Sequence, residues 1–125
     1  MRVRRRNAFL ASLELLRDSA PRLTVTEQIV LLYVAENPGI NIAELAMVAR
    51  LNMATASRSA RSLAARDVPG ALAPYAGLVE LMDNPKDGRG RLLRLSPAGL
   101  ALCDELDGLI RKADPIAAAQ LFAAA

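Results

Sequence analysis

The sequence predicts a mainly α-helical chain that carries one small β-hairpin. Of its 125 residues, 53% are hydrophobic, yet only 3% are aromatic and there is no tryptophan. A core of Leu, Val, Ile and Ala favours closely packed helices, and the length fits one compact domain. Helix-capping signals recur along the chain, whereas a single segment alternates like a strand around a Pro/Gly-rich turn.

The first two helices have clear starts. Asn7 can cap a helix to about Asp18, with an apolar stripe formed by Phe9, Leu10, Leu13 and Leu16. Thr24 and Glu27 form a capping box that opens a second helix to about Glu36. Its expected buried residues are Ile29, Val30, Leu32 and Val34, and the segment Asn37-Pro38-Gly39 ends it.

The next two helices form a helix-turn-helix pattern. Asn41 and Glu44 form a second capping box, and Leu45, Ala46 and Ala49 are expected to pack inward. Arg50 and Leu51 make the turn. Asn52 caps a fourth helix through about Arg66, with Ala56, Ala60 and Leu63 inward and with Ala54, Arg58, Arg61 and Ala65 on the opposite face.

An irregular loop over 67–77 leads into the predicted hairpin. Strands over 78–83 and 91–95 flank a tip that contains Pro85, Gly88 and Gly90. Ser96 and Pro97 open a fifth helix to about Lys112, and a short sixth helix is expected to start at Asp114-Pro115.

Basic residues are concentrated in two segments. The whole chain carries a net charge of +3, but residues 1–22 carry +4 and residues 50–94 carry +4, while the segments between and after them are acidic. Two basic segments suit a polyanionic partner, although such charge is also common on a simple solvated face.

The outer face of the fourth helix is suited to the major groove of DNA. The small residues Ala54 and Thr55 permit close approach to the bases, and Arg58 can bind guanine through two hydrogen bonds. Arg61, Ser57 and Ser62 are expected to reach phosphates. Asn52, at the start of this helix, is also a candidate DNA-binding residue. The alternative is an ordinary helical hairpin in an all-α core.

The hairpin tip supplies a second candidate contact. It carries Lys86, Arg89 and Arg91, and a basic tip can enter a narrow minor groove. Asp87 is expected to orient Arg89 or Arg91 through a charge-assisted hydrogen bond. A solvated turn is the alternative for this segment by itself.

Taken together, these segments resemble the MarR family of winged helix-turn-helix transcriptional regulators over about residues 23–102. The resemblance lies in LTVTEQIVL from Leu23, LAMVARLNMATASR from Leu45, the tip DGRGR and the following LSPAG. Asp87 and Arg89 match the D-x-R pattern of the family, and Asn52 stands where the family has a Ser or Thr cap. Between Leu63 and Leu78 this chain is several residues longer than the family pattern, a difference that can shift the wing.

The resemblance implies a homodimer that binds a palindromic operator, with the helix from Asn52 in the major groove and Arg89 in the minor groove. It divides the chain into a basic arm and dimerisation helix (1–22), a DNA-binding core (23–95) and C-terminal dimerisation helices (96–125). The arm residues Arg2, Arg4, Arg5 and Arg6 are candidates for phosphate contacts. Family members bind aromatic acids, so a small-molecule effector is a further candidate partner, although the four aromatic residues trace no pocket for one.

Other functions have little support in the sequence. The chain has no histidine, so a Ser-His-Asp or Cys-His arrangement is excluded, and it has no nucleotide-binding glycine loop. We therefore expect no enzymatic activity, cofactor or metal site. The single cysteine, Cys103, is expected to be buried and structural, with its pKa raised by Asp104 and Glu105.

No apolar run is long enough to span a membrane, and one cysteine fits a reducing compartment, so we expect a cytoplasmic protein. The second hypothesis for function is a winged-helix module that binds another protein and no DNA.

Overall fold

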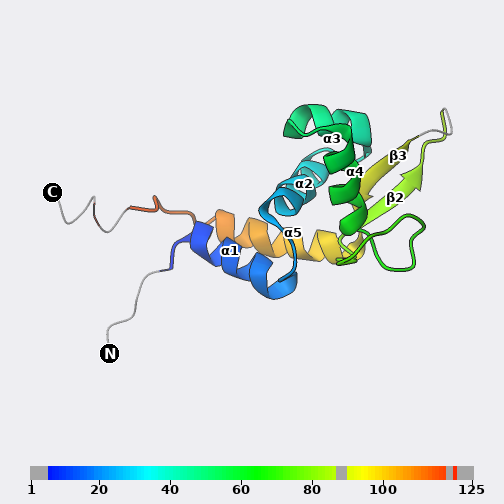
Figure 1. Ribbon diagram of the computed structural model, residues 1–125. Coiled ribbons are helices and arrows are strands. Elements are labelled where there is room, and N and C mark those ends of the chain that lie inside the picture. The colour runs from blue at the N-terminus through cyan, green and yellow to red at the C-terminus, as the bar shows by residue number, and fades with distance from the viewer. Residues whose placement is uncertain (1–5, 87–89, 118–119, 121–125) are drawn as a thin grey trace.

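The computed structural model describes residues 6–86, 90–117 and 120. Within these residues it has five helices: α1 (Ala8–Ser19), α2 (Val25–Glu36), α3 (Ile42–Ala49), α4 (Met53–Ser62) and α5 (Pro97–Ile110). Three strands accompany them: β1 (Ile40–Asn41), β2 (Val79–Asp83) and β3 (Arg91–Leu95). The prediction of a mainly α-helical fold with a small hairpin is confirmed. Figure 1 shows the hairpin of β2 and β3 projecting at one end of the molecule and α1 lying beside α5 at the other.

Every helix begins at the cap that the sequence predicted. The caps are Asn7, Thr24, Asn41, Asn52 and Ser96, and each side chain accepts a hydrogen bond from a backbone amide in the first turn. Both predicted capping boxes form, because Glu27 and Glu44 also bind back to the cap amides. These bonds satisfy amides that have no partner inside the helix.

The sheet has one strand that the sequence analysis missed. Its order is β1-β3-β2, and both pairings are antiparallel, with Ile40 opposite Leu93 and Val79 opposite Leu95. The first strand has only two residues, too few for an alternating pattern to show. It fixes the start of α3 against the sheet, because Asn41 is both a strand residue and the cap of that helix.

Helix α4 is shorter than expected, and this corrects the predicted end at Arg66. The helix stops at Ser62 because the carbonyl of Leu63 accepts hydrogen bonds from the amides of Leu78 (2.8 Å) and Val79 (3.1 Å). Pairing with the incoming strand takes the place of another helical turn. Residues 111–117 form no helix, and most of the predicted sixth helix lies outside the described residues.

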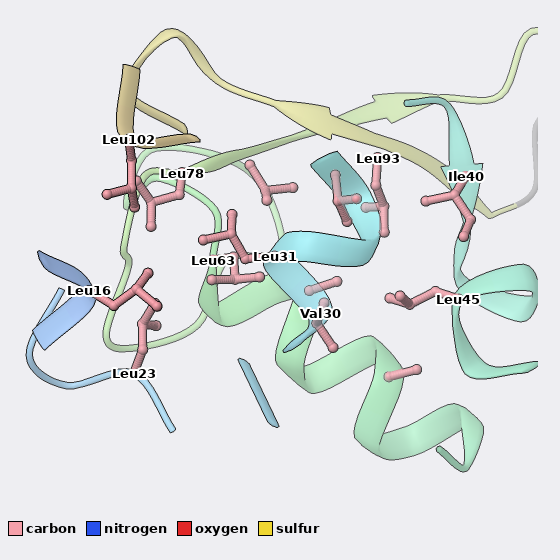
Figure 2. Close-up of a cluster of buried hydrophobic side chains, with 14 of the residues drawn as sticks. Leu16, Leu23, Val30, Leu31, Ile40, Leu45, Leu63, Leu78, Leu93 and Leu102 are labelled. Carbon is pink, nitrogen blue, oxygen red and sulfur yellow. The ribbon is translucent and has the colours of Figure 1, made fainter. Parts of the chain in front are cut away.

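One hydrophobic core joins the helices to the sheet. Its fully buried members include Leu31, Leu45, Leu63 and Leu93, and Leu16 from α1 and Leu102 from α5 belong to the same cluster (Figure 2). The predicted inward residues of α4, namely Ala56, Ala60 and Leu63, are all completely buried.

Two predictions of burial are corrected. In α2, Val30 and Val34 are buried as expected, but Ile29 and Leu32 are exposed and Leu31 is buried in their place. This helix is apolar on most of its circumference, so periodicity could not select the inner face, and packing against α3, α4 and β3 selects it. In α1 only Leu16 of the predicted stripe is buried, whereas Phe9, Leu10 and Leu13 are exposed.

Candidate nucleic-acid interface

Helices α3 and α4 form the predicted helix-turn-helix. Arg50 leaves α3 in the left-handed conformation (φ 57°, ψ 47°), and the Leu51 amide returns to the carbonyl of Ala46 at 2.9 Å. Asn52 then restarts the chain as a helix, its Oδ1 accepting from the Thr55 amide at 2.7 Å. The left-handed residue reverses the chain within two positions, which sets α4 across α3.

The outer face of α4 carries the side chains predicted for base contacts. Ala54 and Arg58 are exposed, and Thr55 and Ser57 are half-buried. The buried residues Ala56 and Ala60 hold the opposite face against the core. The helix therefore presents a narrow row of small residues followed by the exposed guanidinium of Arg58, as close approach to a groove requires.

Ser62 does not belong to this face. Its side chain is buried, and its hydroxyl donates to the carbonyl of Arg58 at 2.8 Å, one helical turn back. The end of α4 turns into the protein at this point, so Ser62 is not available to a phosphate. The expectation that it contacts DNA is therefore corrected.

Arg61 and Arg91 approach the same loop. The Nε of Arg61 donates to the carbonyl of Gly70 at 2.7 Å, and the Nη1 of Arg91 donates to the carbonyl of Pro69 at 2.6 Å. Both side chains are half-buried. The two predicted DNA contacts thus come together in space, although each has one N–H group committed to the protein itself.

The hairpin tip is described only in part. Lys86 is exposed, and its amide donates to Oδ1 of Asn84 at 3.0 Å, which folds the chain into a tight turn. Gly90 has a positive φ of 64° at the start of the returning strand. Asp87 and Arg89 lie outside the described residues, so their predicted roles remain predictions.

Two basic residues near this surface were not singled out by sequence reasoning. Arg94 forms an ion pair with Glu80 across the hairpin at 2.7 Å, on the face opposite Arg91. Arg66 lies over the ring of Tyr75 at 4.2 Å. The strand alternation could have separated Arg94 from Arg91, but contact between Arg66 and Tyr75 depends on the folded loop.

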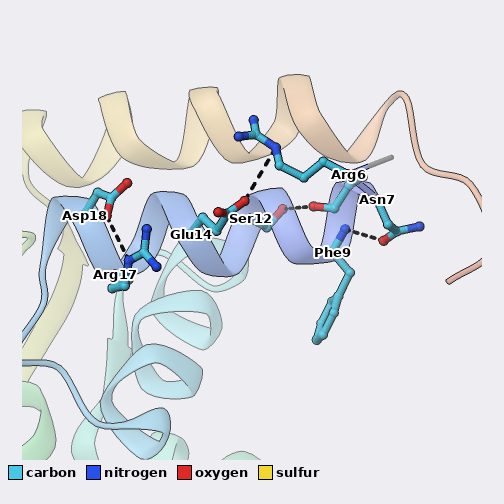
Figure 3. A network of polar contacts seen from close by, with 8 residues as sticks. Arg6, Asn7, Phe9, Ser12, Glu14, Arg17 and Asp18 are labelled. Atoms are coloured by element: carbon cyan, nitrogen blue, oxygen red, sulfur yellow. Dashed lines mark hydrogen bonds and ion pairs between the residues drawn. The ribbon is translucent and has the colours of Figure 1, made fainter. Parts of the chain in front are cut away.

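Of the basic arm, only Arg6 is described. It precedes α1, which lies at the opposite end of the molecule from the hairpin (Figure 1). Figure 3 shows its guanidinium turned toward Glu14 of α1, with Nε 3.5 Å from the carboxylate oxygen. The remaining arm residues, Arg2, Arg4 and Arg5, lie outside the described residues.

A long groove lies between α1, α2 and α5. It encloses about 930 Å³ and is lined by exposed apolar residues that include Phe9, Leu13, Ile29, Leu32 and Ile110. Among the described residues that line it, the charged ones are all acidic: Glu36, Asp104, Asp107 and Asp114. Sequence reasoning missed this cavity because its three walls come from segments that are far apart in the chain.

Cys103 lies on the wall of this groove and is half-buried, which corrects the expectation of a fully buried residue. Burial raises the pKa of its thiol, and the carboxylate of Asp107 raises the pKa further. The acidic neighbour that matters is therefore one helical turn away, not the adjacent Asp104 or Glu105. A raised pKa lowers the thiolate fraction and hence the reactivity.

Among the described residues no group of His, Cys, Asp or Glu side chains could hold a metal ion. In the same part of the chain, no helix has the length and apolarity needed to cross a membrane.

The three-stranded sheet, the helix-turn-helix and the projecting hairpin define a winged helix-turn-helix fold. No family model and no curated protein sequence matches the chain. Solved structures do match it. The PcaV transcriptional regulator from Streptomyces coelicolor is 23% identical, with a TM-score of 0.57 over 84% of this chain and 71% of the other.

Two further matches have the same architecture. Wild-type MarR from E. coli, in its apo form, is 24% identical, with a TM-score of 0.57 over 82% of this chain and 70% of the other. The MepR–DNA complex of S. aureus is 15% identical, with a TM-score of 0.62 over 81% and 73%. The chain therefore has the winged-helix fold of the MarR-type regulators.

Proposed function

We propose that this chain is a sequence-specific double-stranded DNA-binding protein that regulates transcription, as the MarR-type regulators do. The observation that carries the proposal is the outer face of α4, where Ala54 and Arg58 are exposed and Thr55 and Ser57 are half-buried, on a helix that is fixed by two buried alanines. An exposed guanidinium beside partly exposed hydroxyl groups on a helix of this fold has the chemistry that the major groove accepts.

In this proposal α4 lies in the major groove and the wing lies over the adjacent minor groove. Arg58 reads a guanine, and Lys86 and Arg89 of the wing contact the backbone or the minor groove. Asp87 orients a wing arginine, while Asn52 acts by capping the helix. The fold of MepR in its DNA complex supports this arrangement. We propose binding and not catalysis as its activity, because the outer face of α4 has the chemistry of a DNA-contacting surface.

A second copy of the chain is the partner that we propose for the terminal helices. Phe9 and Leu13 on α1 and Leu100 and Ile110 on α5 are large apolar side chains that are at least 44% exposed. Contiguous apolar surface of this kind marks interaction sites. A two-fold dimer would separate its two recognition helices by roughly 34 Å, one turn of DNA.

A small-molecule effector is proposed as a further partner. The structures of PcaV with its natural ligand and of BpsR, whose DNA binding is regulated by 6-hydroxynicotinic acid, have the same fold. In the part of the chain that the structure describes, the charged residues that line the groove are carboxylates. An effector bound there would therefore be neutral or cationic, because a carboxylate ligand would meet like charges.

The decisive experiment is selection of duplexes from a random-sequence library, followed by fluorescence titration of the recovered duplex at several salt concentrations. We expect one preferred, palindromic sequence, with log affinity falling linearly as log salt rises. Binding no stronger than to a scrambled duplex at about 50 mM salt would refute the proposal. A monomer by light scattering with no DNA affinity would favour the protein-binding module.

A further inference from the structure

The segment that joins α4 to β2, residues 65–77, is a folded element that we call the strut. It is the stretch in which the chain exceeds the expected length. Its backbone closes three consecutive turns, in which the amides of Val68, Ala71 and Tyr75 each donate to a carbonyl three residues earlier at 2.9–3.0 Å. Arg66 over the ring of Tyr75 adds a cation–π contact inside the element. The strut therefore has a definite conformation.

The strut is bound along the last turn of α4. The carbonyls of Arg61, Ser62 and Ala64 accept from the amides of Leu72, Ala76 and Gly77 at 3.0, 3.1 and 3.3 Å, respectively. Two of these carbonyls belong to the last turn of α4 and the third lies just beyond it, and the Arg61 carbonyl also accepts from the Ala64 amide at 3.4 Å. The strut therefore supplies hydrogen bonds to the end of α4. The recognition helix and the strut are consequently joined by hydrogen bonds into one unit.

Two guanidiniums connect this unit to the wing. Arg91 is on the same face of β3 as the buried Leu93, two residues along, and this alternation directs its side chain toward α4 and the strut. The Nη1 of Arg91 and the Nε of Arg61 donate to the consecutive carbonyls of Pro69 and Gly70. Such charge-assisted bonds are about twice as strong as neutral ones.

Gly70 is where the two arginines meet. Its φ of +86° favours glycine, and a Cβ built there would lie 3.7 Å from Nη1 of Arg91 and 3.8 Å from Nε of Arg61. One residue of the strut is thus contacted by both a side chain of the recognition helix and a side chain of the wing.

We propose that the strut fixes the position of the wing relative to α4, and that Arg61 and Arg91 are the positioning residues that hold it. The inference rests on the proposed function, because the separation of the helix and the wing matters when both contact one duplex. Arg58 reads sequence directly, whereas Arg61 and Arg91 act through Pro69 and Gly70 by setting the separation that the duplex must match.

The first test measures that separation without DNA. Nitroxide labels are placed on α4 and on the wing by Met53→Cys and Lys86→Cys, in a Cys103→Ser background, and the distance distribution is recorded by pulsed dipolar spectroscopy. We expect one narrow distribution for the parent. Arg61→Met and Arg91→Met should broaden it, and Arg91→Lys, which keeps a donor on a long stem, should restore it.

Arg94→Met is the matched control. It removes one positive charge from the same strand, but Arg94 pairs with Glu80 and not with the strut. The control should leave the distribution narrow. A thermal melt of each variant by circular dichroism establishes that it is folded before its distances are compared.

The second test uses the duplex that the wild type recovers from the library. The ratio of its affinity to that of a scrambled duplex should fall about tenfold in Arg91→Met and change little in Arg94→Met. Unchanged distance distributions in Arg61→Met and Arg91→Met would overturn the inference, and so would broader distributions with an unchanged ratio. A wild type that recovers no preferred duplex would overturn the proposed function, and the distances alone would then decide whether the strut holds the wing.

Discussion

The outer face of α4 and the groove between α1, α2 and α5 are both open to solvent, yet their side chains differ in kind. The face of α4 has small or hydroxyl side chains and an exposed guanidinium at Arg58. The groove has large apolar side chains such as Phe9 and Ile110, and the charged side chains among its described lining residues are negative. The first surface suits a hydrated polyanion and the second would repel one. One small core therefore supports two surfaces with opposite partner chemistry.

The largest change in stability is expected where α5 packs against the residue that precedes β2. Gly99 of α5 faces the backbone of Leu78 so closely that an added Cβ would overlap its carbonyl. Gly99→Ala should lower the free energy of unfolding by about 3 kcal/mol, because backbone must move. Thermal or urea unfolding measures this change.

Gly108→Ala on the same helix is the control for that variant. A Cβ at Gly108 would meet nothing within 4 Å, so alanine should raise stability by about 0.5 kcal/mol. Equal effects of the two variants would show that α5 does not pack against Leu78 as described.

A charged substitution in the groove tests whether this surface forms the proposed dimer. Leu13 is 44% exposed, so Leu13→Glu should leave the fold intact and weaken dimerisation by about 2 kcal/mol or more, if a second copy covers the groove. Light scattering over a concentration series measures the dissociation constant. Met47→Glu, at a 76% exposed position on α3, is the control and should leave the dimer unchanged.

The proposed DNA-binding surface can be tested with substitutions that leave the groove unchanged. Arg58→Ala should reduce discrimination between the selected and scrambled duplexes by about 1–3 kcal/mol, since it removes a base contact. Arg22→Ala removes the same charge from an exposed position outside the helix-turn-helix and should leave discrimination intact. Arg89→Ala should weaken binding to both duplexes more evenly and lower its salt dependence.

Variants of Asn52 separate its role as the cap of α4 from a direct contact with DNA. Asn52→Ala removes the acceptor for the Thr55 amide and should cost about 1 kcal/mol of stability. Asn52→Ser keeps a cap and should restore stability, as measured by urea unfolding. If Ser restored stability but not DNA affinity, Asn52 would have to touch the duplex itself.

The smallest effect is the reactivity of Cys103. Its pKa is raised, so alkylation by iodoacetamide near pH 8 should be slower in the folded protein than in the unfolded chain, and the difference should shrink as pH rises through the folded pKa. The stabilisation linked to the protonated thiol is present below the unfolded pKa and is lost at higher pH. Faster alkylation in the folded state would contradict the described surroundings.

Local chemistry let the sequence determine where the elements begin. Each of the five caps was predicted because a cap acts on amides two or three residues away, within the same segment. Strand β3 was predicted with its observed bounds, and the burial of Ala56, Ala60 and Leu63 followed from helical spacing. The helix-turn-helix and the outer face of α4 could therefore be predicted from the sequence alone.

Contacts between distant segments decided the rest. Only the folded chain shows that α4 ends where β2 arrives, that Ser62 faces inward and that Ile29 and Leu32 of α2 line a groove. In the same way, the sequence predicted Arg61 and Arg91 only as DNA contacts, and the tertiary structure alone brings their guanidiniums to Pro69 and Gly70. A capping bond is fixed by neighbours in the chain, whereas the partner of a long side chain is fixed by what the fold places within its reach.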